Sequence, residues 1–479
     1  MAVGGAETRL LVIDVGTSGV RAVVTDGAAR ILHAEHRELP PSTPAPGLVE
    51  FDPSATAGAA LGLARRAIAA TGRVGAVGIT NQRSSTVAWD RATGEPVGPG
   101  LGWQDQRTLP ACERLFAEGL LIAPNLTATK AAWLLEQADP SGRRDLCVGT
   151  IDTWIAWTLS QGALHVTDPG NAGATGLATP EGVEWSDDRL RRTRVPRRAL
   201  PEIVDSSGVL GPATALEGAP PIAGIAGDQQ ASLLGQGCVR PGMAKITFGS
   251  GGMLDLCVGP ERPAFDVIGS GGSASIIAWR RQGAPTWALE GILLAAGTHI
   301  EWLREIGVIG DSSEAHGIAS SCASSDGVVF VPALLGLGTP YWDFRARGAL
   351  LGVGRSTGRA QIVRAVLEGI AQRAADLVEA AEADGGLAIG ALRIDGGMSA
   401  NPTFVQAVAD ATGRPIEVSP VLEATSLGAA FLAGLAIGVW SDWDEVAATW
   451  APRERIEPLR AFDRARWKDA CERAKSLPG

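Results

Sequence analysis

The turn at residues 14–21, DVGTSGVR, joins two apolar runs and carries an acid, two hydroxyls and a cation, namely Asp14, Thr17, Ser18 and Arg21. Glycine lets backbone N–H groups approach phosphate oxygens closely, and threonine and serine hydroxyls add short donors. A carboxylate beside them suits Mg²⁺, which prefers oxygen ligands. The turn therefore has the chemistry of a phosphate and metal site. An ordinary hairpin, with Asp14 as a turn-capping residue, would explain the same residues.

A second turn of the same design lies about halfway along the chain. Residues 248–252, FGSGG, stand between apolar runs as residues 15–19, VGTSG, do. Two such turns facing each other across a cleft would clamp a nucleotide by its phosphates. The repetition predicts two domains of related design, although an echo of five residues in a glycine-rich chain also arises by chance. The segment CVRPGMAK predicts the boundary, which gives domains at residues 1–240 and 241–479.

Between the two turns lies the acid best suited to catalysis. In GIAGDQQASLLGQG, Asp228 follows a glycine at the end of an apolar strand and precedes a helical run, so it is either a helix N-cap or a general base. A base that takes a proton from an alcohol, oriented by Gln229, is what phosphoryl transfer needs besides Mg²⁺ and donors around the phosphate. The two interpretations are compatible, because a cap position would aim the carboxylate.

The elements that position these residues alternate between strand-like and helix-like patterns, which is typical of α/β layers. Residues 134–162 predict a helix, a loop and a second helix. The longest apolar stretch, residues 427–440, is too short to cross a membrane and predicts a buried core helix. The other expected elements are a hairpin at residues 10–27, a helix near residues 55–70, a strand at residues 74–80 and a hairpin at residues 244–258.

Composition excludes several classes of protein. A chain of 479 residues, 45% hydrophobic and 20% charged, predicts a globular protein with two large domains. A net charge of −10 argues against a nucleic-acid partner, whose binding surface should be basic. The one basic cluster, RLRRTRVPRR at residues 189–198, follows the helix start SDD and predicts a solvated helix face.

The cysteines and the N-terminal residues favour a reducing compartment. No charged region followed by an apolar stretch opens the chain, so we expect a cytoplasmic protein without membrane insertion. Without Cys-x-x-Cys spacing the six cysteines predict buried or free thiols, not disulfides or a zinc site. They are Cys112, Cys147, Cys238, Cys257, Cys322 and Cys471.

Six ordered blocks together resemble the FGGY carbohydrate kinases, most closely their glycerol kinase branch. The blocks are NQR, WQDQRT, GTIDTWIAWTLSQGALHVTD, GIAGDQQASLLGQG, PALLGLGTPYWD and IDGGMSAN. Residues 348–368 fit the family's C-terminal signature, and its first signature is matched around Lys130 and Trp133, with Ala131 smaller than the usual residue. The similarity extends from about Leu10 to Trp440, which is nearly the whole chain.

The resemblance implies two actin-like, ribonuclease-H-type α/β domains flanking a catalytic cleft, with the acceptor bound mainly by the first and ATP mainly by the second. Asp14 and Asp228 would bind Mg²⁺, and Asp228 would also be the general base. The expected acceptor-binding residues are Arg83, Ser84, Trp103, Asn125, Asp228 and Gln229. The expected ATP-binding residues are Thr17, Ser18, Arg21, Thr247, Gly249, Ser250, Gly251, Gly297, Gly397 and Asn401.

Two positions depart from the glycerol kinase pattern. NQR is normally followed by Glu, and here Ser84 follows it. In the acceptor wall, by which we mean the expected acceptor-binding residues, Asn125 replaces an aromatic Tyr. Losing a carboxylate and a phenol that would bind hydroxyls costs about 1–3 kcal/mol each. A wall with shorter side chains also leaves more room. The acceptor is therefore glycerol, bound weakly, or a longer polyol or sugar such as a tetritol, pentitol or pentulose.

The sequence thus predicts an ATP- and Mg²⁺-dependent kinase of a small polyol or sugar, which we expect to form a homo-oligomer such as a dimer. A non-catalytic actin-like ATP-binding protein and an ATP hydrolase without an acceptor are the alternatives, because the fold alone does not fix the activity. Asp228 and Gln229, together with Arg83 and Trp103, favour the kinase, since a polymer or chaperone would not need them.

Overall fold

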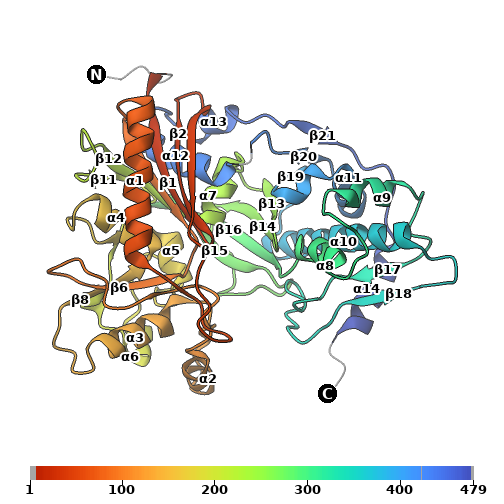
Figure 1. Cartoon of the computed structure of the whole chain (residues 1–479), viewed down its shortest axis with the longest axis horizontal. Helices are drawn as coiled ribbons and strands as arrows, with labels where there is room; N and C mark the ends of the chain where they lie inside the picture. Colours follow the sequence, from red (N-terminus) through yellow and green to blue (C-terminus); the bar gives the residue numbers. More distant parts are fainter. Residues whose placement is uncertain (1–6, 422, 476–479) are drawn as a thin grey trace. The chain divides into compact units, whose positions relative to one another are not determined.

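The computed structural model describes residues 7–421 and 423–475. Within these ranges the chain forms two compact units (Figure 1). The first extends to Gly237 and takes in Ile277–Thr286 and Glu423–Thr449; the second comprises Cys238–Ile276, Trp287–Leu422 and the residues from Trp450. The domain boundary near residue 240 stays a prediction. A single boundary at that residue would assign Ile277–Thr286 and Glu423–Thr449 to the second domain, whereas both segments pack with the first unit.

The sheet of the first unit brings three strand ends to one edge. Its strands follow the order β3-β2-β1-β5-β12-β11. Their bounds are Leu10–Gly16 (β1), Gly19–Thr25 (β2), Ile31–Glu38 (β3), Ala76–Asn81 (β5), Ser207–Pro212 (β11) and Pro221–Gly227 (β12). β1 and β12 both run parallel to β5, with Val15 and Gly227 opposite Asn81. The carboxyl ends of these parallel strands, where α/β proteins place their ligand sites, therefore lie side by side.

Two helices from distant parts of the chain pack against this sheet. The helix α1 (Pro53–Thr71), which is slightly longer than predicted, begins at the N-cap Asp52 with proline at its first position and lies against β2 and β3 (Figure 1). The helix α12 (Ala424–Ile437) is the buried apolar helix that the sequence predicts. It packs on β5, β12 and the helix α7 (Asp228–Gly235).

A smaller layer of the first unit carries the loops near the predicted acceptor residues. Its sheet has the order β4-β7-β6-β8, and the helix α3 (Thr127–Ala138) packs against β6 and β8. These strands are Glu50–Phe51 (β4), Thr86–Asp90 (β6), Gly100–Leu101 (β7) and Leu146–Thr150 (β8). The prediction of helix, loop, helix for residues 134–162 is wrong at β8, which directly precedes α4 (Ile151–Leu159). β8 is buried at every position, so it has no alternation to distinguish it from helix.

The sheet of the second unit, like that of the first, combines an antiparallel hairpin with a parallel neighbour from later in the chain. Its sheet follows the order β21-β20-β19-β13-β14-β16, with β13 antiparallel to β14 and parallel to β19. The bounds are Ala244–Phe248 (β13), Gly252–Gly259 (β14), Ala284–Leu293 (β16), Leu392–Asp395 (β19), Ile416–Val418 (β20) and Glu454–Ile456 (β21). Its helices include α8 (Thr298–Glu305), α10 (Arg359–Gly385) and α11 (Pro402–Thr412), and the hydrophobic core lies between these helices and the sheet.

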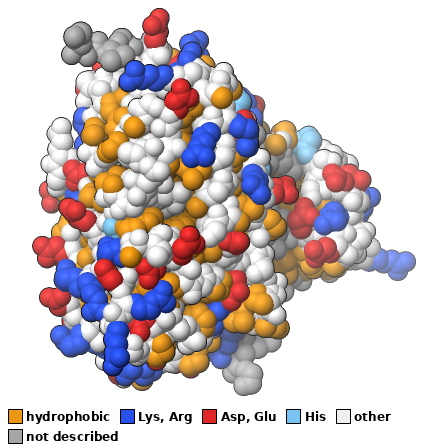
Figure 2. All heavy atoms as spheres, turned by 60° about the vertical axis from the view of Figure 1, so that its left-hand side comes forward, with side chains coloured by type: hydrophobic (Ala, Val, Ile, Leu, Met, Phe, Trp, Pro, Cys, Tyr) orange, Lys and Arg blue, Asp and Glu red, His pale blue; other side chains and the backbone are white. Residues whose placement is uncertain are grey.

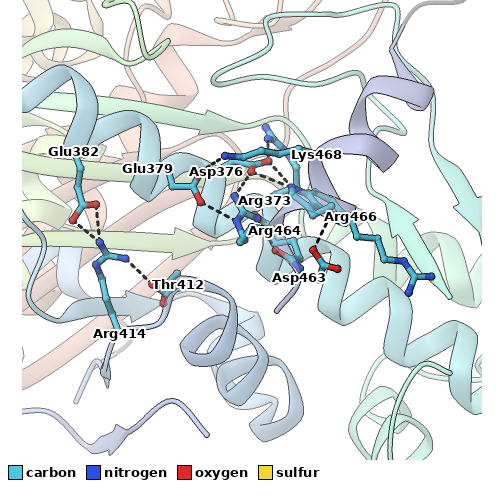
Figure 3. Close-up of polar contacts among 12 residues, drawn as sticks. Arg373, Asp376, Glu379, Glu382, Thr412, Arg414, Asp463, Arg464, Arg466 and Lys468 are labelled. Atoms are coloured by element: carbon cyan, nitrogen blue, oxygen red, sulfur yellow. Dashed lines mark hydrogen bonds and ion pairs between the residues drawn. The ribbon is translucent and has the colours of Figure 1, made fainter. Parts of the chain in front are cut away.

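A network of charges fastens the helix α14 (Arg464–Ala474) to α10 (Figure 3). Asp376 lies 2.5 Å from Arg373 and 2.5 Å from Arg464, and it accepts hydrogen bonds from the Trp467 indole at 3.0 Å. Arg464 also contacts Glu379 at 2.9 Å. Because each buried charge has partners of opposite sign, the network holds α14 in one position without leaving a charge unpaired.

The distribution of surface charge and the state of the cysteines can be compared with what the composition predicts. On the face shown in Figure 2, Lys and Arg side chains lie among acidic and hydrophobic ones. The helix predicted at the basic cluster, α6 (Asp187–Thr193), is capped by Ser186, and in it Arg191 pairs with Asp188 at 2.5 Å. It covers only the first half of the cluster, because Arg194 has a left-handed backbone that ends the helix. All six cysteines are free thiols, as predicted. In the ranges described here, no helix combines the length and hydropathy needed to cross a bilayer.

The packing of α12 predicts a large effect of one methyl group. A Cβ on Gly428 would lie 1.8 Å from the Ala231 carbonyl oxygen of α7, whereas a Cβ on Gly58 of α1 would meet no atom within 4 Å. Gly428→Ala should therefore lower the free energy of unfolding by at least about 1–3 kcal/mol through overpacking. Gly58→Ala, the matched control, should raise it by up to about 1 kcal/mol. Urea unfolding measures both, and equal effects would contradict this packing.

Candidate functional site

The turn after β1 holds a buried carboxylate beside two charged groups. Asp14 is 6% exposed, and its Oδ2 atom lies 3.8 Å from Nη1 of Arg21. Arg21 also reaches Glu423, at 3.3 Å. Ser426, in the first turn of α12, donates a hydrogen bond to Asp14 Oδ2 at 3.4 Å. Thr17 is half-buried and Ser18 exposed at the tip of the turn.

Burial governs the ionisation of Asp14. Loss of solvent raises the pKa of this carboxyl to about 7, and the negative charges of Asp228 and Glu423 add to that rise. The Arg21 guanidinium and the Ser426 hydroxyl oppose it. Asp14 therefore accepts a proton near neutral pH unless more positive charge arrives beside it.

Asp228 projects from the same edge of the sheet. It is the first residue of α7, and the N-cap is Gly227, so the alternative of Asp228 as the cap is wrong. Oδ1 of Asp228 accepts the Gln229 amide at 2.9 Å and lies 3.7 Å from Nε of Arg83. A Cβ on Gly227 would lie 2.6 Å from Cγ of Arg83, so glycine there gives the arginine stem its path. The positive charge of the guanidinium favours the ionised form of this half-buried carboxylate.

Trp103 links the predicted acceptor wall to the first turn. Its indole Nε1–H donates to Oγ1 of Thr17 at 3.2 Å, and its backbone N–H donates to the Ser85 hydroxyl at 3.1 Å. The ring is 40% exposed, which is unusual for tryptophan. Because the indole uses the Thr17 oxygen as an acceptor, the Thr17 hydroxyl proton is free to turn outward.

Ser84 and Asn125 differ in what they offer a ligand. Ser84 is buried with a φ of 65°, and its hydroxyl donates to the Ala174 carbonyl at 2.9 Å. Its own carbonyl accepts the Thr127 hydroxyl at 3.1 Å. Asn125 is exposed. The Ser84 hydroxyl hydrogen is thus committed within the protein, whereas the Asn125 side chain faces solvent.

In the second unit the turn between β13 and β14 has its own set of supports. Thr247 is the last residue but one of β13 and is half-buried, and Gly249 and Ser250 are exposed at the tip. Lys245 donates to the Thr247 hydroxyl at 3.0 Å and pairs with Asp255 across the hairpin at 2.8 Å, with both charged side chains fully buried.

Close backbone approaches bring further predicted residues to this second turn. The Gly297 amide donates to the Gly249 carbonyl at 2.9 Å, and a Cβ on Gly297 would lie 2.8 Å from that oxygen. Gly251 is equally confined, since its Cβ would lie 2.9 Å from the Leu293 carbonyl oxygen. These contacts join the turn to the start of α8.

The segment after β19 supplies the remaining predicted nucleotide residues. Gly397 opens a 3₁₀ turn and has open space where a Cβ would stand. The preceding Gly396, at φ +86°, packs on the Phe248 backbone, where a Cβ would lie 2.3 Å from the carbonyl oxygen. Asn401 caps α11 by accepting the Phe404 amide at 3.1 Å.

The first unit therefore gathers Asp14, Thr17, Arg21, Arg83, Trp103 and Asp228, and the second gathers Thr247, Gly249, Ser250, Gly251 and Gly297. Sequence reasoning missed Glu423, Ser426, Lys245 and Gly396. A lysine inside the apolar run AKITF, with an acid in the facing run MLDLCV, was the available signal for Lys245. No local signal marked Glu423 or Ser426, because both lie more than 400 residues from Asp14 along the sequence. Among the described residues no three acidic, histidine or cysteine side chains gather to hold a metal by themselves.

Comparison with known proteins gives a consistent family. Residues 9–235 match the FGGY family of carbohydrate kinases, N-terminal domain, and residues 276–437 match its C-terminal domain. A glycerol kinase of Aromatoleum aromaticum is 42% identical over 97% of this chain and 98% of its own, and one of Deinococcus radiodurans is 40% identical over 97% of each. The structure of Plasmodium falciparum glycerol kinase with ADP has a TM-score of 0.90 at 30% identity, over 98% and 99% of the two chains. These likenesses confirm the predicted α/β fold class of two actin-like domains.

The buried Asp14 predicts a stability that depends on pH. With a pKa of about 7 against an ordinary value near 4, the folded state binds a proton that the unfolded state lacks between these pH values. Stability that depends on this proton is therefore present at low pH and lost as pH rises toward 7. Asp14→Asn removes the ionisation, so its gain in Tm over the parent should be larger at pH 8 than at pH 5.

Thermal unfolding in EDTA buffers measures this difference. Asp152, whose pKa burial also raises to about 7, is present in both proteins and cancels. An equal change in Tm at the two pH values would show that Asp14 does not titrate in this range.

Proposed function

Because the chain belongs to the FGGY family of carbohydrate kinases, we propose that it transfers the γ-phosphoryl group of ATP to a terminal hydroxyl of a small polyol, with glycerol as the first acceptor. The observation that carries the proposal is Asp228, held beside Arg83 at the sheet edge that also bears the Asp14–Thr17 turn. The curated relatives at about 40% identity, which carry the name glycerol kinase, support this acceptor.

Asp228 is the proposed base. As the acceptor hydroxyl attacks the γ-phosphorus, its proton passes to the Asp228 carboxylate while the bond to the β-phosphate oxygen breaks and ADP leaves. The Arg83 guanidinium, 3.7 Å away, favours the ionised carboxylate that this step needs. Arg83, Gln229 and the face of Trp103 would hold the acceptor's hydroxyls and carbons.

Mg²⁺ suits the acids present. It binds proteins through one or two carboxylates and completes its shell with water and substrate phosphates. Asp14 and Asp228 are close enough that the charge of one raises the pKa of the other. When bound there, the ion would neutralise charge on the transferring phosphate. Asp14 and Asp228 would hold it, and its positive charge would keep Asp14 ionised.

Each unit offers donors of its own for the phosphates of a nucleotide. In the first unit, Thr17, Ser18 and Arg21 would supply hydroxyl, backbone and cationic donors for phosphates. In the second unit, hydroxyl and backbone donors would come from Thr247, Gly249, Ser250 and Gly251. Gly397, with open space at its α-carbon, and Gly297 and Asn401 would border the adenosine. Lys245 would orient Thr247 through their 3.0 Å hydrogen bond.

A longer polyol or a sugar is a second candidate acceptor, and Ser84 is the observation that favours it. A glutamate at this position would offer a carboxylate to two hydroxyls, whereas the Ser84 hydroxyl is turned to the Ala174 carbonyl. The lost interaction is worth about 1–3 kcal/mol with glycerol, and the shorter side chain leaves room for further carbons.

Replacing the base tests the reaction. Asp228→Asn should lower kcat by about 10²–10⁴-fold, because the amide cannot accept the proton, with the KM for ATP changed little. Asp52→Asn, at the N-cap of α1, is the matched control and should keep the parental kcat, since asparagine caps equally well. A coupled assay of ADP release with glycerol measures both. Near-parental turnover in Asp228→Asn would exclude Asp228 as the general base. ADP release that does not depend on any polyol would identify an ATP hydrolase.

A panel of acceptors tests the second candidate. We expect phosphorylation of glycerol with a high KM, and a higher kcat/KM for a tetritol, pentitol or pentulose. Asn125→Tyr should move the preference toward glycerol by adding a phenol and filling space. Ser84 is less suitable for substitution, because its φ of 65° would strain most larger side chains. The exposed Phe116 of the helix Leu109–Ala117 offers a control substitution to tyrosine. A micromolar KM for glycerol in the parent would exclude the longer acceptor.

A further inference from the structure

Lys130 on α3 is a buried cation whose hydrogen bonds go to backbone oxygens. Among the described residues, Lys130 and Lys245 are the lysines with no exposed surface. Lys245 has a carboxylate partner at 2.8 Å, that of Asp255. Nζ of Lys130 instead donates to the carbonyl oxygens of Gly102, at 3.1 Å, and of Asn125, at 3.0 Å.

The two carbonyls belong to separate segments of the proposed acceptor wall. Gly102 precedes Trp103, whose indole donates to Thr17 and whose amide donates to Ser85. Asn125 lies in the loop that leads into α3, where Thr127 donates to the Ser84 carbonyl. One ammonium group therefore joins the segment that carries the tryptophan to the segment that carries Asn125.

This position is costly for a lysine. Burial lowers the pKa of Lys130 to about 7, against the attraction of Asp105 and a smaller contribution from Cys112. The Asp105 carboxylate is already engaged by Arg107, at 2.8 Å, and by the Val49 amide, at 2.7 Å. A methionine would fill the same volume without this penalty, so packing alone does not account for the amine.

We propose that Lys130 is a positioning residue that fixes the separation of the Gly102–Trp103 and Asn125 segments and thereby sets the affinity for the acceptor. This inference rests on the proposed function. Both segments lack regular secondary structure at the bonded carbonyls, and their hydrogen bonds to Nζ tie them to the rigid helix α3. Without these bonds, the wall residues would sample wider separations, and binding would have to restrict them again.

The test compares three variants on one helix. Lys130→Met keeps the length of the side chain and removes every donor, whereas Lys130→Gln retains an NH₂ group. Thr129→Val is the matched control, because the buried Thr129 hydroxyl contacts Thr108 at 2.8 Å and neither wall carbonyl. Circular dichroism and Tm first establish that each variant is folded.

Hydrogen exchange of the protein without substrates tests the positioning itself. Lys130→Met should accelerate exchange at least tenfold in peptides covering residues 100–107 and 121–127, with Thr129→Val leaving both at the parental rate. Parental exchange in both peptides of Lys130→Met would overturn the proposal. This result is independent of activity, so it separates a failure of the inference from a failure of the proposed function.

Kinetics with glycerol and a pentitol then test the consequence. Lys130→Met should raise the KM of the acceptor at least tenfold, with the KM for ATP and the kcat at saturating acceptor changing less than threefold. Lys130→Gln should recover part of the acceptor affinity. Equal increases in both KM values, or the same change in Thr129→Val, would show that Lys130 only supports the fold.

Discussion

The close seating of α12 on the sheet of the first unit is the contact on which the candidate site depends. Glycines remove the side chains that would keep the backbones apart. A Cβ on Gly78 of β5 would lie 2.5 Å from the Ala429 carbonyl oxygen, and one on Gly224 of β12 would lie 2.7 Å from the Ala433 nitrogen. Gly235 and Gly428 bring α7 and α12 equally close to one another. Few side chains could enter this interface without moving a helix or a strand.

That seating explains how distant parts of the chain come to share one site. The N-terminal end of α12 lies at the edge formed by β1, β5 and β12, so Glu423 and Ser426 reach Asp14 and Arg21. The same packing fixes α7, whose first residue is Asp228. The charges at this edge are thus assembled by backbone contact. Burial raises the pKa of Asp14, and the charges of Asp228 and Glu423 add to the rise while that of Arg21 opposes it.

The strands and turns with local signals could be predicted, and the contacts between distant segments could not. The hairpins around residues 17 and 250, the helix after residue 53 and the core helix after residue 424 all follow from hydrophobic pattern and turn residues. The strand β8 was missed because burial on both faces removes its alternation. The family was predicted from six ordered blocks and is confirmed. The roles of the site residues stay predictions, and the orientation of Ser84 toward Ala174 depends on a φ of 65° that no pattern indicates.

The two buried lysines show how one kind of side chain can serve two purposes. Lys245 lies inside a sheet, where the facing strand supplies Asp255, so its charge is neutralised, and a second N–H group of the ammonium orients the Thr247 hydroxyl. Lys130 lies under two loops whose carbonyl groups would otherwise need water or another N–H or O–H donor. Burial lowers the pKa of this amine to about 7, because the partial charges of two carbonyls replace the lost water less well than a carboxylate would. Its neutral form still has two N–H groups, which is the number of carbonyls it must satisfy. The link between the two loops therefore does not require the lysine to stay charged, and this explains how the protein tolerates an amine there without a dedicated counter-ion.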